Sequence, residues 1–353
     1  MDKIRSFFKR KDIEFSAKRY GIDALGAMAQ GLFASLLIGT IISTIGEQAG
    51  VQILVDIGTF AKGATGYAMA VAIGHALKCP PLVLFSLAAV GGAANSLGGA
   101  GGPLAVLVIT ILAAECGKAV SKETKIDILV TPFVTILVGS LLSIGLAPYI
   151  GAAASAVGNA IMWATELQPF FMGILVSVMV GIALTLPISS AAICAALGLT
   201  GLAGGAAVAG CCAQMVGFAV MSFRENRWGG LFAQGIGTSM LQMGNIVKNP
   251  RIWIPAIVTS AITGPIATCV FQMNMNGAAV ASGMGTCGLV GQIGVYTGWM
   301  SDIAAGSKAA VTAFDWIGLI LICFLLPGVI CWALGALLRR LGWIRENDLK
   351  LEL

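Results

Sequence analysis

Long apolar stretches, separated by short clusters of basic residues, run through almost the whole chain. Of the 353 residues, 58% are hydrophobic and only 10% are charged. A soluble globule of this composition would have too few polar side chains to cover its surface. Apolar runs of about twenty residues are long enough to cross a bilayer as helices. The sequence therefore predicts an all-α polytopic membrane protein.

About ten transmembrane helices are predicted, together with two re-entrant hairpins. The crossings are placed near residues 20–45, 62–77, 80–97, 102–119, 127–149, 169–189, 190–203, 204–223, 252–271 and 310–338. Residues 146–167 are interpreted as an interfacial segment on the outer side. Residues 228–247 and 277–300 are apolar but rich in Gly, Gln, Asn, Ser and Thr. We interpret them as the hairpins, because irregular backbone enters a membrane only where protein buries it or a cavity adjoins it.

The distribution of Lys and Arg predicts the orientation of the chain. If the N-terminus is cytoplasmic and each hairpin returns to its own side, all of the 21 basic residues except Lys62 and Lys308 lie in cytoplasmic segments. Both termini are then cytoplasmic, although this agreement depends in part on how the hairpins are assigned. Three segments follow: a basic segment 1–19, a transmembrane domain 20–338 and a cytoplasmic tail 339–353.

The first nineteen residues are the most basic part of the chain. Seven Lys and Arg residues alternate there with Phe7, Phe8, Ile13 and Phe15. Basic residues interleaved with apolar ones are typical of an amphipathic segment that lies on an anionic cytoplasmic leaflet. We prefer this interpretation to nucleic-acid binding, and we expect the lipid bilayer to be the partner.

Metal and nucleotide sites are not expected. The nine cysteines occur singly, or as the neighbours Cys211 and Cys212, and no CxxC pair is present. We interpret them as small buried hydrophobic residues, and we expect neither a zinc site, nor a disulfide framework, nor a cofactor. The Gly-rich stretch 88–106 lacks the lysine of a phosphate-binding loop. Its segment GGAANSLGG (91–99) resembles GGAAVAGCC (204–212), which suggests an internal repeat.

Polar side chains inside apolar sequence are the candidate functional residues, because they are costly to keep in a membrane. Glu115 lies one helical turn from Lys118. It either pairs with that lysine or lies on a solute or proton path. His75 is a candidate because histidine is a common proton-transfer residue, but a lone histidine is also a common packing residue. Asn95 and Ser96 either reach a cavity or lie in a tightly packed turn.

Uncharged hydrogen-bonding side chains are concentrated in the first predicted hairpin. They are Gln234, Thr238, Ser239, Gln242 and Asn245, and Gln292 lies in the second hairpin. Such groups donate and accept hydrogen bonds, which suits a hydroxylated or other neutral polar solute. Lys248 and Arg251 are predicted at the cytoplasmic mouth, where they would meet a phosphate. The alternative is that the amides only join two helices.

Four stretches carry a resemblance to a known family. They are KRYGIDALGAMAQGLFASLLIGTII (18–42), GAGGPLAVLVITILAAECGKAVSKETKIDILVTP (99–132), TSMLQMGNIVKNPRIWIPAIVTSAITGPIA (238–267) and GMGTCGLVGQIG (283–294). They resemble the IIC-type membrane subunits of the bacterial phosphotransferase system, in the branch that includes perfringolysin O regulators. The resemblance implies a homodimer in the bacterial plasma membrane, with ten helices and re-entrant hairpins, that exposes a sugar to a cytoplasmic IIB-type phosphoryl donor.

The chain departs from the glucose-type members of this family. Those proteins place a glutamate and a histidine at the sugar, whereas residues 228–247 contain no carboxylate and His75 is the only histidine. No soluble donor domain is recognised in the chain, so sugar phosphotransfer, if it occurs, would require a separate cytoplasmic donor protein. Two functions follow from the sequence: a permease for a small neutral polar solute, or a membrane sensor that regulates gene expression and retains the permease fold.

Overall fold

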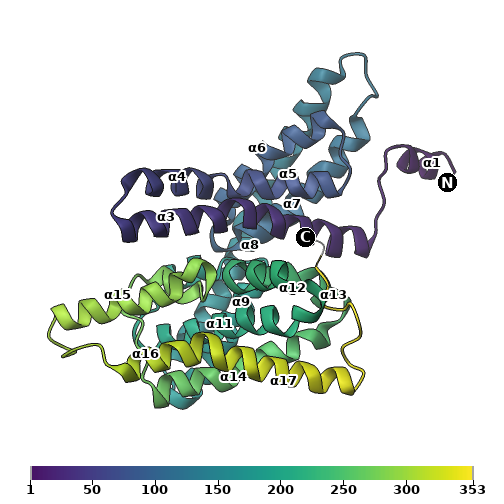
Figure 1. The fold of residues 1–353 in the computed structure, drawn as a ribbon. Coiled ribbons are helices and arrows are strands. Elements are labelled where there is room, and N and C mark those ends of the chain that lie inside the picture. Colours follow the sequence, from purple (N-terminus) through teal and green to yellow (C-terminus); the bar gives the residue numbers. More distant parts are fainter. Residues whose placement is uncertain (1, 352–353) are drawn as a thin grey trace. The chain divides into compact units, whose positions relative to one another are not determined.

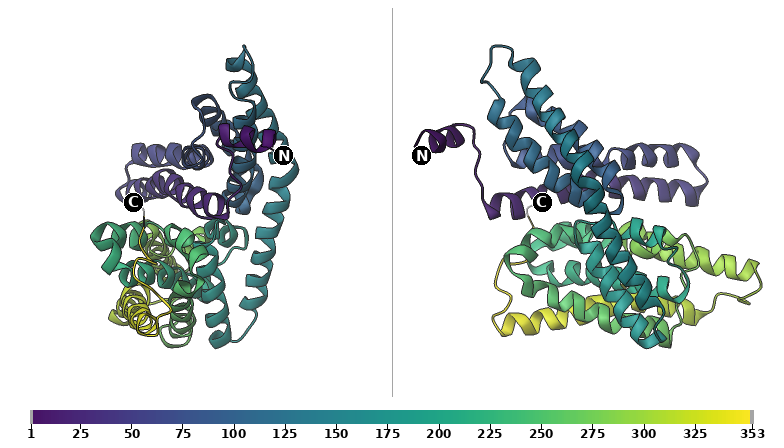
Figure 2. Two further views of the ribbon diagram at one scale, coloured as in Figure 1. Left: turned by 90° about the vertical axis from the view of Figure 1, so that its right-hand side faces the viewer. Right: turned by 180° about the vertical axis from the view of Figure 1, so that it is seen from behind.

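The structure is a computed structural model that describes residues 2–351, so Met1, Glu352 and Leu353 of the predicted terminal segments lie outside the described residues. The described residues form helices and no strand, with a single isolated bridge between Gly201 and Met275 (Figures 1 and 2). The predicted all-α class is therefore confirmed. The chain divides into two compact units, Met1–Ala153 and Ala154–Leu353.

The first unit is built from paired helices that pack closely. Its helices are α1 (Asp2–Arg10), α2 (Ala24–Leu32), α3 (Ile38–Ala49), α4 (Gln52–Gly63), α5 (Thr65–Ala76), α6 (Pro81–Gly98), α7 (Gly102–Val120) and the first part of α8 (Asp127–Thr165). α5 packs against α2 and α6, and α6 packs against α7. The chain reverses between α6 and α7 at Gly99, whose φ of +50° is accessible to glycine at little cost.

The second unit is arranged around one buried helix, α11 (Gly201–Met221). The other helices of this unit are the end of α8, α9 (Pro169–Thr185), α10 (Ser190–Ala196), α12 (Phe223–Phe232), α13 (Met243–Lys248), α14 (Ile254–Pro265), α15 (Val290–Ala304), α16 (Ala313–Ile320) and α17 (Leu326–Arg340). α11 contacts α9, α14 and α17 (Figure 1). Small residues allow this approach, because a Cβ at Gly210 of α11 would overlap the carbonyl oxygen of Ser177 in α9.

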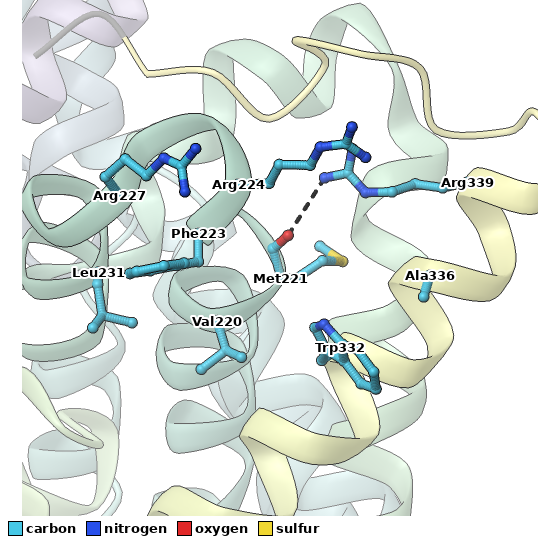
Figure 3. Close-up of a pocket in the computed structure, with 9 residues that line it drawn as sticks. All are labelled: Val220, Met221, Phe223, Arg224, Arg227, Leu231, Trp332, Ala336 and Arg339. Carbon is cyan, nitrogen blue, oxygen red and sulfur yellow. Dashed lines mark hydrogen bonds between the residues drawn. The ribbon is translucent and has the colours of Figure 1, made fainter.

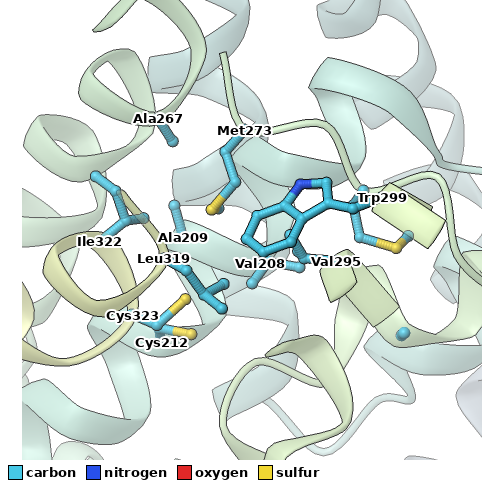
Figure 4. Close-up of a cluster of buried hydrophobic side chains, with 12 residues drawn as sticks. Val208, Ala209, Cys212, Ala267, Met273, Val295, Trp299, Leu319, Ile322 and Cys323 are labelled. Carbon is cyan, nitrogen blue, oxygen red and sulfur yellow. The ribbon is translucent and has the colours of Figure 1, made fainter. Parts of the chain in front are cut away.

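The middle of α11 lies in an apolar core. Val208 and Cys212 of α11 pack with Met273, Trp299 and Ile322, all of which are buried (Figure 4). Cysteine serves as a small apolar side chain in this core, as the sequence predicted. Six of the nine cysteines are buried, whereas Cys116 and Cys269 are exposed.

Within residues 2–351, six helical stretches are long and apolar enough to cross a membrane. They are Arg19–Ala49, Pro81–Val120, Asp127–Thr165, Gly201–Met221, Pro250–Val270 and Ala313–Arg340. The stretch Pro81–Val120 contains both α6 and α7, and the shorter apolar helix α9 lies outside this set. A polytopic membrane protein is thus supported, while the number of crossings, the re-entrant hairpins and the internal repeat are not confirmed.

Two predicted segments have a different local structure. No spanning helix forms at 190–203, because α10 has only 7 residues and the left-handed Gly198 and Gly201 interrupt the chain after it. Seven residues rise only about 10 Å, a third of the bilayer core. Most of the predicted interfacial segment 146–167 belongs to α8, which continues through Pro148 to Thr165 as one long helix (Figure 2).

The close approach of α9 and α11 predicts a specific effect of adding one methyl group. Gly210→Ala should lower the free energy of unfolding by about 1–3 kcal/mol, since the new Cβ has no space beside Ser177. Gly145→Ala is the matched control, because a Cβ there meets nothing within 4 Å. Thermal unfolding of the purified protein in detergent measures both variants. Equal unfolding midpoints would contradict the tight α9–α11 packing.

Candidate functional site

The predicted amide segment lies at an interruption between two helices of the second unit. After α12, the chain makes one π-helical turn at Ala233–Gly237 and becomes extended at Thr238, with φ −157° and ψ 143°. It then forms a 3₁₀ turn, Ser239–Gln242, before α13 begins. The Thr238 hydroxyl accepts a hydrogen bond from the Met240 N–H at 3.1 Å and thereby caps this turn.

Three amide side chains form a continuous hydrogen-bonded chain across this interruption. The Gln242 Nε2 donates to Gln234 Oε1 at 2.9 Å, and the Asn245 Nδ2 donates to Gln242 Oε1 at 2.8 Å. At the other end, Gln234 Nε2 donates to Ser222 Oγ at 2.9 Å. All four residues are buried. The structure thus brings together three of the predicted site residues.

The C-terminal tail accepts further hydrogen bonds from two of these amides. Gln242 Nε2 donates to the Leu349 carbonyl at 3.0 Å, and Asn245 Nδ2 donates to the Lys350 carbonyl at 2.9 Å. Asn226 of α12 donates to the same Leu349 carbonyl at 2.7 Å and accepts from the Leu351 N–H at 2.8 Å. The tail therefore covers the amide chain.

Two apolar side chains anchor the tail to the second unit. Ile344 and Leu349 are buried against a cluster that includes Phe218 and Ile252. Burying a side chain of this size contributes about 1.5–3 kcal/mol. The apolar anchors and the amide hydrogen bonds both attach the tail to the second unit, so the tail can leave the amides only when both kinds of contact are lost.

A second polar network connects the amide segment to α11. The hydroxyls of Ser239 and Thr185 lie 2.8 Å apart. Thr185 and the Trp253 Nε1 both donate to Gln214 Oε1, at 3.2 and 2.8 Å, and Gln214 Nε2 donates to Ser260 Oγ at 3.3 Å. Gln214 is fully buried and stands at the centre of this network. The sequence analysis missed Gln214, although a single amide inside an apolar spanning helix was a signal for it.

The two predicted hairpins meet beside α11. The turn Cys287–Leu289, which precedes α15, contacts the π turn Ala233–Gly237. Gln292 of α15 donates from Nε2 to Cys212 Sγ at 3.2 Å, and its buried Oε1 has no hydrogen-bond partner in the described part of the chain. A buried acceptor without a partner is costly, so this oxygen is available to a ligand donor.

Lys248 and Arg251, the two basic residues predicted at the cytoplasmic mouth, have different surroundings. Lys248 lines a cavity of about 240 Å³ together with Asn245 and three residues of the tail, Asn347, Asp348 and Lys350. Arg251 does not line this cavity; its guanidinium lies 5.4 Å from the centre of the Trp343 ring. A cation over an indole face is a favourable contact. Arg251 therefore helps to hold the tail, whereas Lys248 lies beside the amides, in a cavity that Lys350 of the tail also lines.

Glu115 belongs to a buried ionic cluster in the first unit. Its carboxylate lies 2.8 Å from the Lys118 ammonium and accepts a hydrogen bond from the Tyr20 hydroxyl at 3.0 Å. Lys118, with 1% of its side chain exposed, also donates to the carbonyls of Asp12 and Leu77. A hydrogen bond from Arg19 holds the pKa of the Asp12 carboxyl below its usual range. This geometry matches the first of the two alternatives predicted for Glu115, a pair with Lys118.

The other predicted residues of the first unit have few polar contacts. His75 is exposed in the last turn of α5, and Ser96 is exposed near the end of α6. Asn95 is packed against the start of α7, since a Cβ at Gly102 would lie 2.7 Å from its Oδ1. Their proposed roles at a solute stay predictions. Among the described residues, no group of three His, Cys, Asp or Glu side chains is placed to hold a metal ion.

The comparisons with known proteins point to one family. The model of the family described as "Phosphotransferase system, EIIC" matches residues 22–351. The match therefore includes both compact units and most of the tail that covers the amides. The chain matches no curated protein and no solved structure.

The ionic cluster of the first unit predicts the outcome of a double-mutant cycle. Glu115→Gln should destabilise the protein by about 3–5 kcal/mol, because it leaves the Lys118 charge buried without its carboxylate. Adding Lys118→Met should restore most of the loss, since the unpaired charge is removed. Unfolding midpoints in detergent measure the cycle. An unchanged midpoint combined with loss of solute uptake would instead place Glu115 on a transport path.

Proposed function

Because the chain belongs to the phosphotransferase system EIIC family, we propose that it is a permease for a small neutral, sugar-like solute that binds to the amide groups of the second unit. The family supports a permease of the phosphotransferase type in general. The identity of the solute and of the residues that bind it is proposed from the geometry of the second unit.

The observation that carries the proposal is the set of buried amides at the helix interruption. Gln234, Gln242 and Asn245 present both N–H donors and carbonyl acceptors, and they carry no charge. A neutral polyol needs such groups, because each hydroxyl both donates and accepts. Discontinuous helices line the solute sites of many transporters.

The hydrogen bonds of the tail support the proposed positions of the solute hydroxyls. The carbonyl oxygens of Leu349 and Lys350 accept from Gln242 and Asn245, and a hydroxyl oxygen accepts the same bonds. The cavity beside Asn245 measures about 240 Å³, which is below the roughly 300–1,000 Å³ of ordinary ligand pockets. We therefore expect the tail to move aside when the solute binds.

Lys248 supports a site for phosphoryl transfer at the mouth. It is exposed and lines the cavity beside Asn245, so it would attract a phosphoryl group brought by a cytoplasmic IIB-type partner. No carboxylate lies within residues 228–247 to act as a base, so we propose that the donor protein supplies the reactive group. We also propose that both termini are cytoplasmic, on the basis of the charge distribution. The family resemblance supports a homodimer in a bacterial plasma membrane.

Two amide substitutions test the solute site. A panel of neutral sugars and polyols is first screened by thermal shift of the purified chain, because a ligand at a hundred times its Kd stabilises by about 2.7 kcal/mol. Gln242→Ala and Asn245→Ala should each weaken binding of the stabilising solute about 5- to 10-fold, the loss expected for one or two neutral hydrogen bonds.

Asn226→Ala is the matched control for this test. Asn226 holds the tail through two hydrogen bonds but lies in α12, outside the cavity. Loosening the tail alone should therefore preserve or improve solute binding. Destabilisation of the ligand-free protein by Gln242→Ala and Asn245→Ala, with unchanged solute affinity, would contradict the proposed site. Unimpaired cellular uptake after deletion of the protein would instead favour the regulator.

A further inference from the structure

A second cavity in the C-terminal unit combines arginines with an apolar floor. It measures about 470 Å³ and is lined by α11, α12 and α17. Figure 3 shows Arg224, Arg227 and Arg339 along one rim, with Val220, Leu231 and Trp332 below them. None of these residues belongs to the amide network, so the cavity is a separate feature.

The charge at this cavity is only partly compensated. Arg339 pairs with Glu225 at 2.7 Å and donates to the Met221 carbonyl at 3.4 Å, so its charge is satisfied within the protein. Arg224 and Arg227 are exposed and form no ion pair with any carboxylate of the described residues. Two guanidinium groups are therefore free to bind an anion, and phosphate oxygens match their planar donors.

Arg227 has an unusual backbone conformation. Arg227 has φ +50° and ψ −149° inside α12, a conformation that is strained for a residue with a Cβ. The kink at Arg227 lies between Arg224 and Leu231, both of which line the cavity. Strain at this position is consistent with a functional demand on the arginine.

Exposed aromatic residues near this cavity are consistent with a position at the membrane surface. Trp228 is 65% exposed and stacks on Phe232 at 6.3 Å, and Trp332 is 60% exposed. Exposed aromatic side chains, Trp in particular, are typical of the zone between lipid headgroups and acyl chains. A free phosphate would use only the arginines and would leave the apolar floor without a partner.

We propose that this cavity binds one anionic phospholipid, whose phosphate contacts Arg224 and Arg227 and whose acyl chain lies over Leu231 and Trp332. The positive rim selects an anionic headgroup, and the apolar floor selects an attached chain. The site differs from the amphipathic N-terminal segment, because it is a defined cavity of the second unit. Basic pockets between membrane helices bind lipid headgroups by the same chemistry.

Quenching of tryptophan fluorescence tests the proposal on the full chain in uncharged detergent. Phosphatidylglycerol brominated on its acyl chains is titrated against phosphatidylcholine carrying the same chains. The anionic lipid should quench at lower concentration, and Trp332→Phe should remove this selective component. Trp163→Phe, which replaces an exposed tryptophan of α8, should leave it in place.

Arginine variants decide which groups provide the selectivity. Arg224→Gln and Arg227→Gln should each raise the concentration of phosphatidylglycerol at half-quenching about tenfold, with no change for phosphatidylcholine. Arg340→Gln is the matched control, because Arg340 is exposed in the last turn of α17 and does not line the cavity. Unfolding midpoints confirm that each variant is folded.

Three results would overturn the proposal. Equal quenching by the two lipids would show that no anionic headgroup is recognised. Unchanged selectivity in both folded arginine variants would place the headgroup elsewhere. Displacement of the quencher by millimolar inorganic phosphate, without any dependence on acyl chains, would assign the cavity to a soluble anion.

Discussion

Most buried amide groups of the C-terminal unit have hydrogen-bond partners within the protein, the Gln292 oxygen being the exception, and this requirement governs the arrangement around α11. An unsatisfied polar group in such an interior costs about 1–3 kcal/mol. Gln214 therefore collects hydroxyls and an indole from neighbouring segments, while Gln242 and Asn245 use the carbonyls of the tail. The tail is thus part of the folded unit, although it follows the last spanning helix.

Close helix packing allows these polar groups to meet. α11 approaches α9 at Gly210, and α9 approaches α14 at Gly173 and Gly264, where a Cβ would overlap the facing backbone. The backbones come near enough for Ser177 of α9 to donate to the Ser260 carbonyl of α14 at 2.7 Å. Glycine packing and buried hydrogen bonding therefore depend on each other in this unit.

The sequence predicts the class of the fold better than it predicts individual contacts. Apolar runs located most of the long helices, because hydrophobicity and length are local properties. The short α10 was misjudged as part of a crossing, since its apolar composition resembles that of a spanning helix. The sequence singled out Gln234, Gln242 and Asn245 as a group, but it did not reveal that Leu349 and Lys350 accept their bonds. That pairing joins residues more than a hundred positions apart, which no local pattern encodes.

The central claim is that the solute and the tail compete for the same amides. Hydrogen exchange of residues 343–351 measures this competition directly, because the Leu351 N–H is bonded to Asn226 and the Trp343 N–H to Leu338. In the presence of the solute that stabilises the protein, the Leu351 amide should exchange faster while exchange in α11 slows. Unchanged protection of the tail at saturating solute would contradict the account.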